Sequence, residues 1–248
     1  MDRSDKPHPR PFPDDVEAAF RLRAKREMRA AMQRMRSATP ASARAARSEA
    51  IRQRLKSMAI YDGATSIALF HPIERKGEVD LRGVDRDARA RGLRVAYPTI
   101  HEPNEEPELD PTAGAQLRPR TMSFRWVDLD DERLDEARIA DALEDRGRGF
   151  LEPRQDAPFA AVDHLDLILV PGLAFDPTGH RLGYGAAFYD MTLEGANRAR
   201  TIGVAFDFQI VAEIPVTPGD VPVQAVVTDR RTFLRPKRPD DAARSNEG

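Results

Sequence analysis

Apolar residues recur along this chain with two different spacings, and the spacing changes near residue 60. Between Asp15 and Met35 they return at three- and four-residue steps, which predicts an amphipathic helix. An aspartate at position 14 or 15 is a suitable N-cap for it. A second helix is expected from about Pro40 to Met58. The chain is therefore predicted to form two helices before its first strand.

Beyond residue 60, short continuous apolar runs alternate with helical patterns. The strongest run is Leu165–Val170, and runs of this kind between turn residues are typical of buried strands. The other strands are expected at Ser66–Phe70, Leu93–Tyr97, Phe124–Val127, Ile202–Phe206 and Ala225–Thr228, with helices at Leu81–Arg91 and Met191–Ala199. This alternation predicts an α/β fold with an open, mostly parallel sheet covered by helices on both faces.

The expected domain is single and covers residues 15–235. Residues 1–14 are polar and rich in proline, and residues 236–248 are polar, so we expect a disordered lead-in and a disordered tail. The interior segment 101–120 is long for a connection inside a compact domain. A variable insertion is favoured there over a flap beside a site, because long loops are tolerated on surfaces.

Composition excludes several classes of function. The net charge is −2, so no general attraction to nucleic acid or to an acidic membrane is expected. No apolar run approaches the roughly 20 residues that span a bilayer. The absence of cysteine excludes thiolate chemistry and fits a reducing compartment. The first residues also lack the apolar segment of a secretory signal, so a cytoplasmic location is expected.

The richest segment for chemistry is VPGLAFDPTGHRLGYGAAFYD, from Val170 to Asp190. It joins the strongest predicted strand to a helix, and backbone N–H groups at such a helix N-terminus can hold a phosphate. It is neither a Walker A loop nor a dinucleotide-binding fingerprint, because neither glycine pattern is complete. By spacing alone, a phosphate loop and an ordinary strand-to-helix turn are equally well supported.

The residues of this segment closely resemble the signature of 5-formyltetrahydrofolate cyclo-ligases. That signature runs from Pro-Gly through Phe-Asp and Arg-Leu-Gly-x-Gly to an aromatic residue and Tyr-Asp, here from Pro171 to Asp190. The resemblance implies that a single stretch of nine residues binds ATP. These residues are Arg181, Leu182, Gly183, Tyr184, Gly185, Ala186, Ala187, Phe188 and Tyr189.

The first predicted helix carries the Lys-Arg-x-x-Arg pattern of the same family at Lys25, Arg26 and Arg29. Lys25 and Arg29 are one helical turn apart and lie on the same side. Taken alone, a solvated basic face is the favoured interpretation, because other arginines share the helix. The resemblance instead implies that all three residues bind ATP.

The resemblance also implies where the reduced folate binds. Glu78, in the sequence Glu-Val-Asp, matches the glutamate that binds folate in the family. Tyr184 and Phe188 would contact the same substrate by ring packing. His71 stands before a proline at a strand end, where a pocket-lining role and a structural role both remain open.

The segment from Ile202 to Asp229 resembles the closing part of the family, with Asp220 at its acidic position. The resemblance implies that Asp190 and Asp220 hold Mg²⁺, an ion that prefers oxygen ligands. Without the resemblance, an aspartate beside a turn is more often interpreted as a cap. The chain has Gly219 where a histidine is frequent in the family, and Phe188 where tyrosine or histidine is common.

A further departure is that Ala186 and Ala187 replace two glycines of the family pattern. If either position has a positive φ, alanine is strained there by about 1 kcal/mol or more. If both lie in the first turn of a helix, alanine is harmless. We expect the second case.

The activity implied by the resemblance is that of a ligase of one-carbon metabolism. The formyl oxygen of 5-formyltetrahydrofolate attacks the γ-phosphorus of ATP, N10 closes the ring, and 5,10-methenyltetrahydrofolate, ADP and phosphate result. Lys25, Arg29 and Arg181 would be the catalytic residues, because they orient the phosphates and neutralise their charge. The expected partner is the small-molecule folate alone, for a monomer or homodimer.

Two other functions remain open at this point. One is a catalytically altered paralogue that binds folate or nucleotide without turnover. The other is a sugar-phosphate-isomerase-like or sensor protein on a similar sheet, which fold alone does not distinguish.

Overall fold

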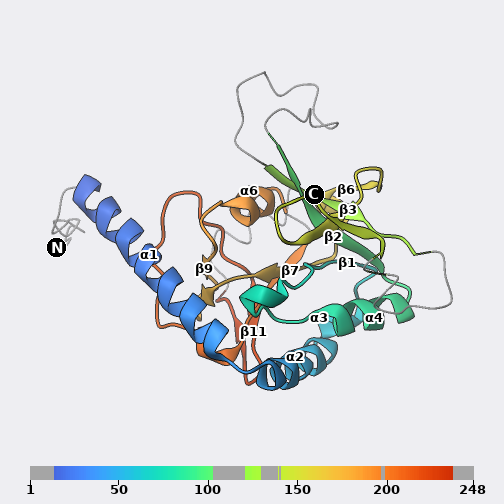
Figure 1. Cartoon of the computed structure of the whole chain (residues 1–248), viewed down its shortest axis with the longest axis horizontal. Coiled ribbons are helices and arrows are strands. Elements are labelled where there is room, and N and C mark those ends of the chain that lie inside the picture. Colours follow the sequence, from blue (N-terminus) through green and yellow to red (C-terminus); the bar gives the residue numbers. More distant parts are fainter. Residues whose placement is uncertain (1–13, 103–120, 130–138, 140, 197–198, 237–248) are drawn as a thin grey trace, which may run out of the picture.

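The computed structural model describes residues 14–102, 121–129, 139, 141–196 and 199–236 of the 248-residue chain (Figure 1). The expected lead-in, apart from residue 14, the tail beyond residue 236 and residues 103–120 of the long segment lie outside the described residues. The expectations about disorder and about an insertion therefore stay predictions.

The helices follow the apolar pattern closely near the N-terminus. Helix α1 spans Asp14–Ala38, and the expected second helix is α2, Ala41–Lys56. A short helix α3, Ala59–Asp62, follows beyond its predicted end. Helix α4 spans Arg82–Ala90, and α6 spans Phe188–Glu194. Short 3₁₀ turns are η1, Glu74–Lys76, η2, Val162–His164, and η3, Asp207–Gln209. No described helix has the length and apolar character needed to cross a membrane.

Two strands and one helix have bounds that differ clearly from the prediction. Strand β2 ends at His101 rather than Tyr97, and β3 begins at Thr121 rather than Phe124. The largest difference is in helix α6. It begins at Phe188 rather than Met191 and ends at Glu194 rather than Ala199. The start is earlier because the glycine-rich segment turns into the helix at Ala187, which has a positive φ. The end is earlier because Gly195 follows as its C-cap.

Eight described strands form one sheet in the order β12-β11-β10-β7-β1-β2-β3-β6. Their bounds are β1 Ser66–Ala68, β2 Arg94–His101, β3 Thr121–Trp126, β6 Phe159–Ala160, β7 Leu167–Pro171, β10 Arg200–Val204, β11 Ala225–Val227 and β12 Thr232–Leu234. The five strands β11, β10, β7, β1 and β2 are parallel, and antiparallel strands flank them at both edges. The mostly parallel sheet is thus confirmed.

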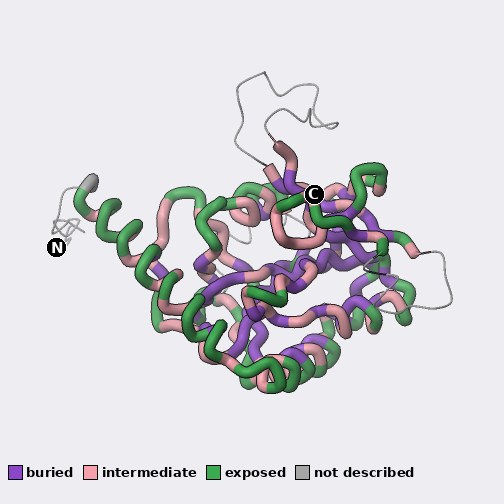
Figure 2. The backbone as a smooth tube through the Cα atoms, viewed as in Figure 1, coloured by how far each residue is buried: buried purple, intermediate pink, exposed green. Residues whose placement is uncertain are grey.

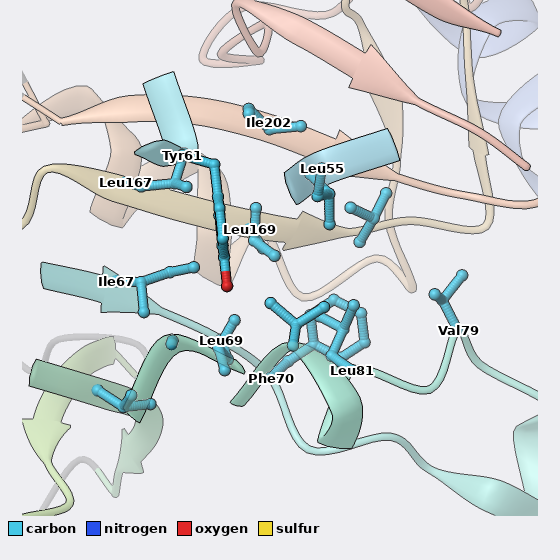
Figure 3. Packing of buried hydrophobic residues seen from close by; sticks show 14 of the residues in the cluster. Leu55, Tyr61, Ile67, Leu69, Phe70, Val79, Leu81, Leu167, Leu169 and Ile202 are labelled. Atoms are coloured by element: carbon cyan, nitrogen blue, oxygen red, sulfur yellow. The ribbon is translucent and has the colours of Figure 1, made fainter. Parts of the chain in front are cut away.

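Helices cover both faces of this sheet, as predicted. On one face α2, α3 and α4 bury Leu55, Tyr61 and Val84 against strand residues such as Leu167 (Figure 3). On the other face Leu193 of α6 packs in a second cluster with residues of β3, β7 and β11. The backbone coloured by burial shows the sheet as the buried centre, with the exposed positions on the surrounding helices (Figure 2).

One buried polar group joins α4 to strand β2 within the first face. Arg89 Nε donates to Asp85 Oδ1 at 2.6 Å, and Arg89 Nη1 donates to the carbonyl of Val127 at 2.6 Å. The hydroxyl of Tyr97 donates to Asp85 Oδ2 at 2.6 Å. Although Asp85 is fully buried, its charge is paired and both its oxygens accept hydrogen bonds.

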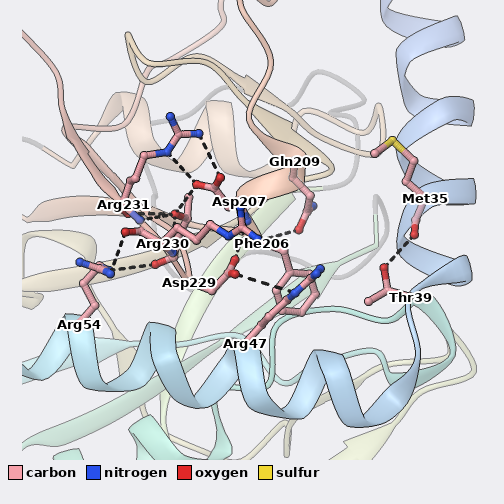
Figure 4. A network of polar contacts seen from close by, with 11 residues as sticks. Met35, Thr39, Arg47, Arg54, Phe206, Asp207, Gln209, Asp229, Arg230 and Arg231 are labelled. Atoms are coloured by element: carbon pink, nitrogen blue, oxygen red, sulfur yellow. Dashed lines mark hydrogen bonds and ion pairs between the residues drawn. The ribbon is translucent and has the colours of Figure 1, made fainter.

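A second polar network fastens the turn between β11 and β12 to helix α2 (Figure 4). Arg54 donates to the backbone carbonyls of Thr228 and Arg230 at 3.2 and 2.9 Å. Arg231 pairs with Asp207 of η3 at 3.0 Å. These contacts hold the antiparallel edge of the sheet against its helical layer.

Two small hairpins lie outside the main sheet: β4, Leu143–Asp145, with β5, Leu151–Pro153, and β8, Ala174–Phe175, with β9, Arg181–Leu182. The β8–β9 hairpin forms the first part of the glycine-rich segment, between β7 and α6. Met28 and Met32 of α1 pack against a cluster that includes Leu182. The helix at the start of the chain is therefore docked on the segment predicted to carry the chemistry.

The order of the parallel strands reverses between β1 and β7. From β1 the chain proceeds to β2 on one side, whereas β10 and β11 follow β7 on the other. In open α/β sheets, ligands bind outside the carboxyl ends of the strands at such a switch point. The glycine-rich segment leaves β7 at this position.

Candidate active site

A cavity of about 400 Å³ lies at the carboxyl ends of β1, β2 and β7. This volume is within the range of small-molecule sites. The predicted site residues that line it are Lys25, Arg29, Glu78, all residues from Arg181 to Asp190, and Asp220. Arg26 is exposed and is not among the lining residues, so the structure does not bring it to the cavity. The cavity thus gathers residues from both ends of the chain.

Lys25 is held in the cavity wall by the segment that precedes β11. Its ammonium lies 2.6 Å from Asp220 Oδ2 and 2.8 Å from Thr217 Oγ1. Lys25 is only 6% exposed, which is low for a lysine, and its pairing with Asp220 compensates the burial. Burial opposes ionisation of Asp220, but hydrogen bonds from Lys25 and Thr217 together hold the pKa of this carboxyl below its usual value.

Arg29, one turn further along α1, contacts the glycine-rich segment directly. Its Nε donates to the carbonyl of Gly183 at 2.9 Å. Gly185 follows with a φ of 110°, a conformation that L side chains rarely adopt. Arg29 therefore has a structural role in addition to its place on the basic face of α1, because its side chain fixes the path of the glycine-rich segment.

Arg181 and Tyr189 leave polar atoms unsatisfied beside the cavity. Arg181 Nη2 lies 2.9 Å from Asp190 Oδ1, but neither this atom nor Nε makes a hydrogen bond to any described residue. The buried hydroxyl of Tyr189 is also without a partner among the described residues. Burial raises the pKa of Tyr189 well above its usual value, so the hydroxyl stays protonated. Unsatisfied donors at a cavity wall indicate a place for ligand acceptors.

Ala187 has the backbone conformation that was not expected of it. With φ 55° and ψ 13° it is left-handed and serves as the N-cap residue of α6, outside the first helical turn. The expectation of a harmless alanine is therefore wrong at this position, because a Cβ in this region costs about 1–2 kcal/mol. Ala186 has no positive φ, so the strain is confined to one of the two alanines.

Glu78 and Tyr184 form a second polar group in the cavity. The Tyr184 hydroxyl donates to Glu78 Oε1 at 2.9 Å, and the backbone N–H of Ile73 donates to Glu78 Oε2 at 3.0 Å. The ammonium of Lys76 lies 4.1 Å from the centre of the Tyr184 ring. Burial, followed by the Glu78 charge, raises the pKa of Tyr184 above its usual range. Residues predicted as separate folate contacts are thus bonded to each other.

The two predicted metal ligands line the same cavity. Asp190 Oδ1 accepts from the Val221 N–H at 3.2 Å, and Asp220 Oδ2 accepts from Lys25 and Thr217. The second oxygen of each carboxylate accepts no hydrogen bond from the described residues. Among the described residues, no cluster of three or more acidic or histidine side chains is suited to a metal. The donor set therefore suits Mg²⁺ only if phosphate oxygens and water complete the shell.

Some cavity residues carried no usable signal in the sequence. Thr217, which bonds both Lys25 and Asp220, belongs to a polar turn that resembles any other. The apolar wall includes Ile100 of β2, Met122 of β3 and Phe150 of the turn between β4 and β5. For Thr217, the only available signal was its three-residue spacing from Asp220, which is typical of a local hydrogen bond between a side chain and the backbone.

Comparison with known proteins identifies the family of the chain. The sequence model of the 5-formyltetrahydrofolate cyclo-ligase family matches residues 21–229. The chain is 39% identical over 85 residues to the 5-formyltetrahydrofolate cyclo-ligase of Escherichia coli K12, a match that covers 33% of this chain and 47% of that protein. The Mycolicibacterium smegmatis 5-formyltetrahydrofolate cyclo-ligase is 44% identical over 78 residues, which cover 31% of this chain and 40% of that relative. These matches span less than half of the relatives' length.

Solved structures match over more of the chain. The Aquifex aeolicus 5,10-methenyltetrahydrofolate synthetase has a TM-score of 0.67 at 26% identity and covers 86% of this chain and 94% of its own. The Mycoplasma pneumoniae 5,10-methenyltetrahydrofolate synthetase has a TM-score of 0.59 at 19% identity, over 83% of this chain and 98% of that one, and so supports the fold alone. Because the family model extends from α1 through β11, the chain belongs to the 5-formyltetrahydrofolate cyclo-ligase family.

Proposed function

We propose that this chain catalyses the ATP-dependent cyclisation of 5-formyltetrahydrofolate to 5,10-methenyltetrahydrofolate, with release of ADP and phosphate. The observation that carries the proposal is a single cavity with two chemically different parts. One part holds cationic side chains that are paired with aspartates or have donors without a hydrogen bond, and the other is an apolar wall beside a glutamate. Such a combination suits a polyphosphate and a heteroaromatic ring bound side by side.

The phosphate-binding part of the cavity is formed by Lys25, Arg29 and Arg181. In the structure Lys25 is paired with Asp220 and Arg181 with Asp190. Phosphate oxygens would compete with these carboxylates for the cations, and Arg181 already has donors without a hydrogen-bond partner. These cations would orient the phosphates and neutralise the charge that develops during transfer.

Asp190 and Asp220 are the residues that would hold Mg²⁺, each through its oxygen without a hydrogen bond from the described residues. Bound MgATP would supply the phosphoryl group that activates the formyl oxygen. With the aspartates engaged by the ion, Lys25 and Arg181 would lose their carboxylate partners and would be available to the phosphate oxygens. We therefore expect metal and nucleotide to strengthen each other's binding.

The folate part of the cavity is formed by Glu78, Tyr184 and Phe188 against the apolar wall. Glu78 can accept hydrogen bonds from ring N–H and amino groups, and the aromatic side chains can pack on the ring. The apolar wall excludes water from the activated formyl group, which favours attack by N10 of the same molecule. No covalent nucleophile is required for this reaction.

The direct test is to mix the purified protein with MgATP and 5-formyltetrahydrofolate and to follow the absorbance of the methenyl product. Product formation that requires both substrates is expected. Binding of both ligands without product would support the catalytically altered paralogue instead. Binding of neither ligand would contradict the proposal.

A paired variant tests the assignment of the phosphate residues. The double change Lys25→Ala and Arg29→Ala should weaken ATP binding by about 100-fold or more, since two charge-assisted contacts are lost. The matched control is Arg23→Ala with Arg34→Ala on the exposed side of the same helix. Unchanged ATP affinity in the first variant would favour a sensor protein that does not use ATP.

A further inference from the structure

One arginine of helix α1 is buried, although it belongs to a series of six that otherwise lie at the surface or are half-buried. Arg36 is 3% exposed and occupies the last turn of the helix. Arginine is rarely buried to this extent unless its guanidinium is paired and hydrogen-bonded. The partners of Arg36 therefore indicate its role.

Arg36 connects three segments that are distant in sequence. Its Nε donates to the carbonyl of Lys76 in η1 at 2.6 Å. One of its Nη atoms donates to the hydroxyl of Tyr184 in the glycine-rich segment. The same nitrogen lies 3.9 Å from Glu78 Oε1, and both side chains of this ion pair are almost fully buried. Arg36 thus contacts both predicted folate-binding polar groups.

The hydrogen bonds have a defined direction. Because Arg36 donates to the Tyr184 oxygen, the Tyr184 hydroxyl proton is directed towards Glu78 Oε1, 2.9 Å away. Glu78 Oε2 is fixed by the backbone N–H of Ile73. The orientation of the Glu78 carboxylate is therefore determined by Arg36 on one side and by the chain backbone on the other.

Arg36 itself does not line the cavity, whereas Glu78 and Tyr184 do. It lines a separate void of about 10 Å³ behind Glu78, together with Gly172 and Gln209. Arg36 therefore has no surface on which a ligand in the cavity could rest. Any effect that it has on a ligand must act through the cavity residues that it contacts, which are Glu78, Tyr184 and Lys76.

We propose that Arg36 is a positioning residue that fixes Glu78 and Tyr184 for the reduced-folate ring and so determines affinity for the folate but not for the nucleotide. The inference rests on the proposed function, because Glu78 is taken as the folate-binding group. An arginine is required rather than a lysine, since Nε and Nη donate in different directions at once and a single ammonium does not reproduce this fork.

The experiment compares Arg36→Met, Arg36→Lys and Tyr184→Phe with the matched control Arg34→Met, an exposed arginine two residues away. Calorimetry measures the Kd for 5-formyltetrahydrofolate and, separately, for a non-hydrolysable ATP analogue. Thermal unfolding checks that each variant is folded. Arg36→Met is expected to weaken folate binding by about ten-fold or more, with Arg36→Lys and Tyr184→Phe between it and wild type. For Arg36→Met and Arg36→Lys the affinity for the ATP analogue should stay within about two-fold, as should both affinities of Arg34→Met.

The outcomes separate this inference from the proposed function. Wild-type protein that binds no folate contradicts the proposed function itself. If wild type binds folate, and the folded Arg36→Lys and Tyr184→Phe variants bind it equally well, the positioning role is wrong. A parallel loss of affinity for both ligands would show that Arg36 only supports the fold. Should Arg36→Met not fold, Arg36→Lys and Tyr184→Phe decide the question alone, because both preserve most of the side-chain volume.

Discussion

Two groups of an arginine, an aspartate and a tyrosine, one in the core and one at the cavity, differ in how well their hydrogen-bonding atoms are satisfied. In the core, Arg89 makes a two-point contact with Asp85, which also accepts from Tyr97. At the cavity, Arg181 lies beside Asp190 without an aligned hydrogen bond and over the Tyr189 ring, and the Tyr189 hydroxyl has no hydrogen-bond partner among the described residues.

Burial alone does not explain the difference. The side chains of Arg89 and Arg181 are 6% and 5% exposed, so both guanidinium groups have lost almost all their water. The core group recovers that loss through hydrogen bonds, whereas the cavity group does not. A buried polar group is therefore informative about function when its donors are directed at a cavity and unsatisfied.

The largest expected effects come from removing each arginine. Arg89→Met leaves the fully buried Asp85 charge without its cation, so we expect a loss of about 3–5 kcal/mol in the free energy of unfolding. Arg181→Met should change that free energy by only about 1 kcal/mol or less, because Asp190 keeps some exposure and its bond from Val221. Urea denaturation measures both values.

The loss of activity should be larger in Arg181→Met than in Arg89→Met, which is the reverse of the expected loss of stability. Arg181→Met is expected to lower kcat by about 10²–10³-fold, since the donor proposed for the transferring phosphoryl group is lost. Arg89→Met should retain its kcat for whatever fraction of the protein is folded. An equal loss of stability in both variants would break the comparison between core and cavity.

The two tyrosines give a finer version of the same contrast. Tyr97→Phe removes a donor from Asp85 and should destabilise the protein by about 1–3 kcal/mol. Tyr189→Phe removes a buried hydroxyl that makes no hydrogen bond to a described residue, so the free energy of unfolding should be unchanged or higher. Thermal and urea unfolding of both variants check this prediction. A marked loss of stability in Tyr189→Phe would mean that its hydroxyl is satisfied in the folded protein.

A smaller effect is expected at the two alanines before α6. Ala187→Gly removes the left-handed strain, about 1–2 kcal/mol, and adds the entropy cost of glycine, about 0.5–1 kcal/mol. The free energy of unfolding should therefore rise by about 0–1.5 kcal/mol. Ala186→Gly is the control, because its φ is not positive and only the entropy cost applies. Destabilisation by both changes would show that Ala187 is not strained.

The smallest effect concerns His71, which lines the cavity near Arg82. Burial, and then the Arg82 charge, lower the pKa of His71 below its usual value in the folded protein. The unfolded chain therefore binds a proton more readily, and stability falls as the pH drops below about 6.5. His71→Gln should flatten this slope between pH 7 and 5. A slope unchanged in the variant would assign it to other groups.

The fold was predictable wherever apolar runs were long enough to show a period. The run that became β7 and the spacing that became α1 both met this condition. Strands β6, β8 and β9 have two residues each, which is too short for any alternation to be seen. Their pairing is determined by tertiary contacts that no local pattern encodes.

The candidate site was predictable where the family signature is dense and not where the chemistry is indirect. Residues 181–190 all line the cavity as expected. Arg36 was indistinguishable from its neighbours, because burial of one arginine among six depends on where η1 packs against α1. The conformation of Ala187 was predicted wrongly, because a residue's φ at a helix start depends on how the preceding loop closes.

The docking of α1 on the glycine-rich segment also sets the order in which the protein can be completed during synthesis. Lys25 and Asp220 are separated by 195 residues, and Arg29 and Gly183 by 154. At about 5–20 residues per second, Lys25 waits roughly 10–40 s for its partner to be made. During this interval the apolar side of α1, with Met28 and Met32, has no surface to cover it. The earliest helix of the chain is thus among the last to find its place, and the nascent protein has a period in which it is open to chaperones or to aggregation.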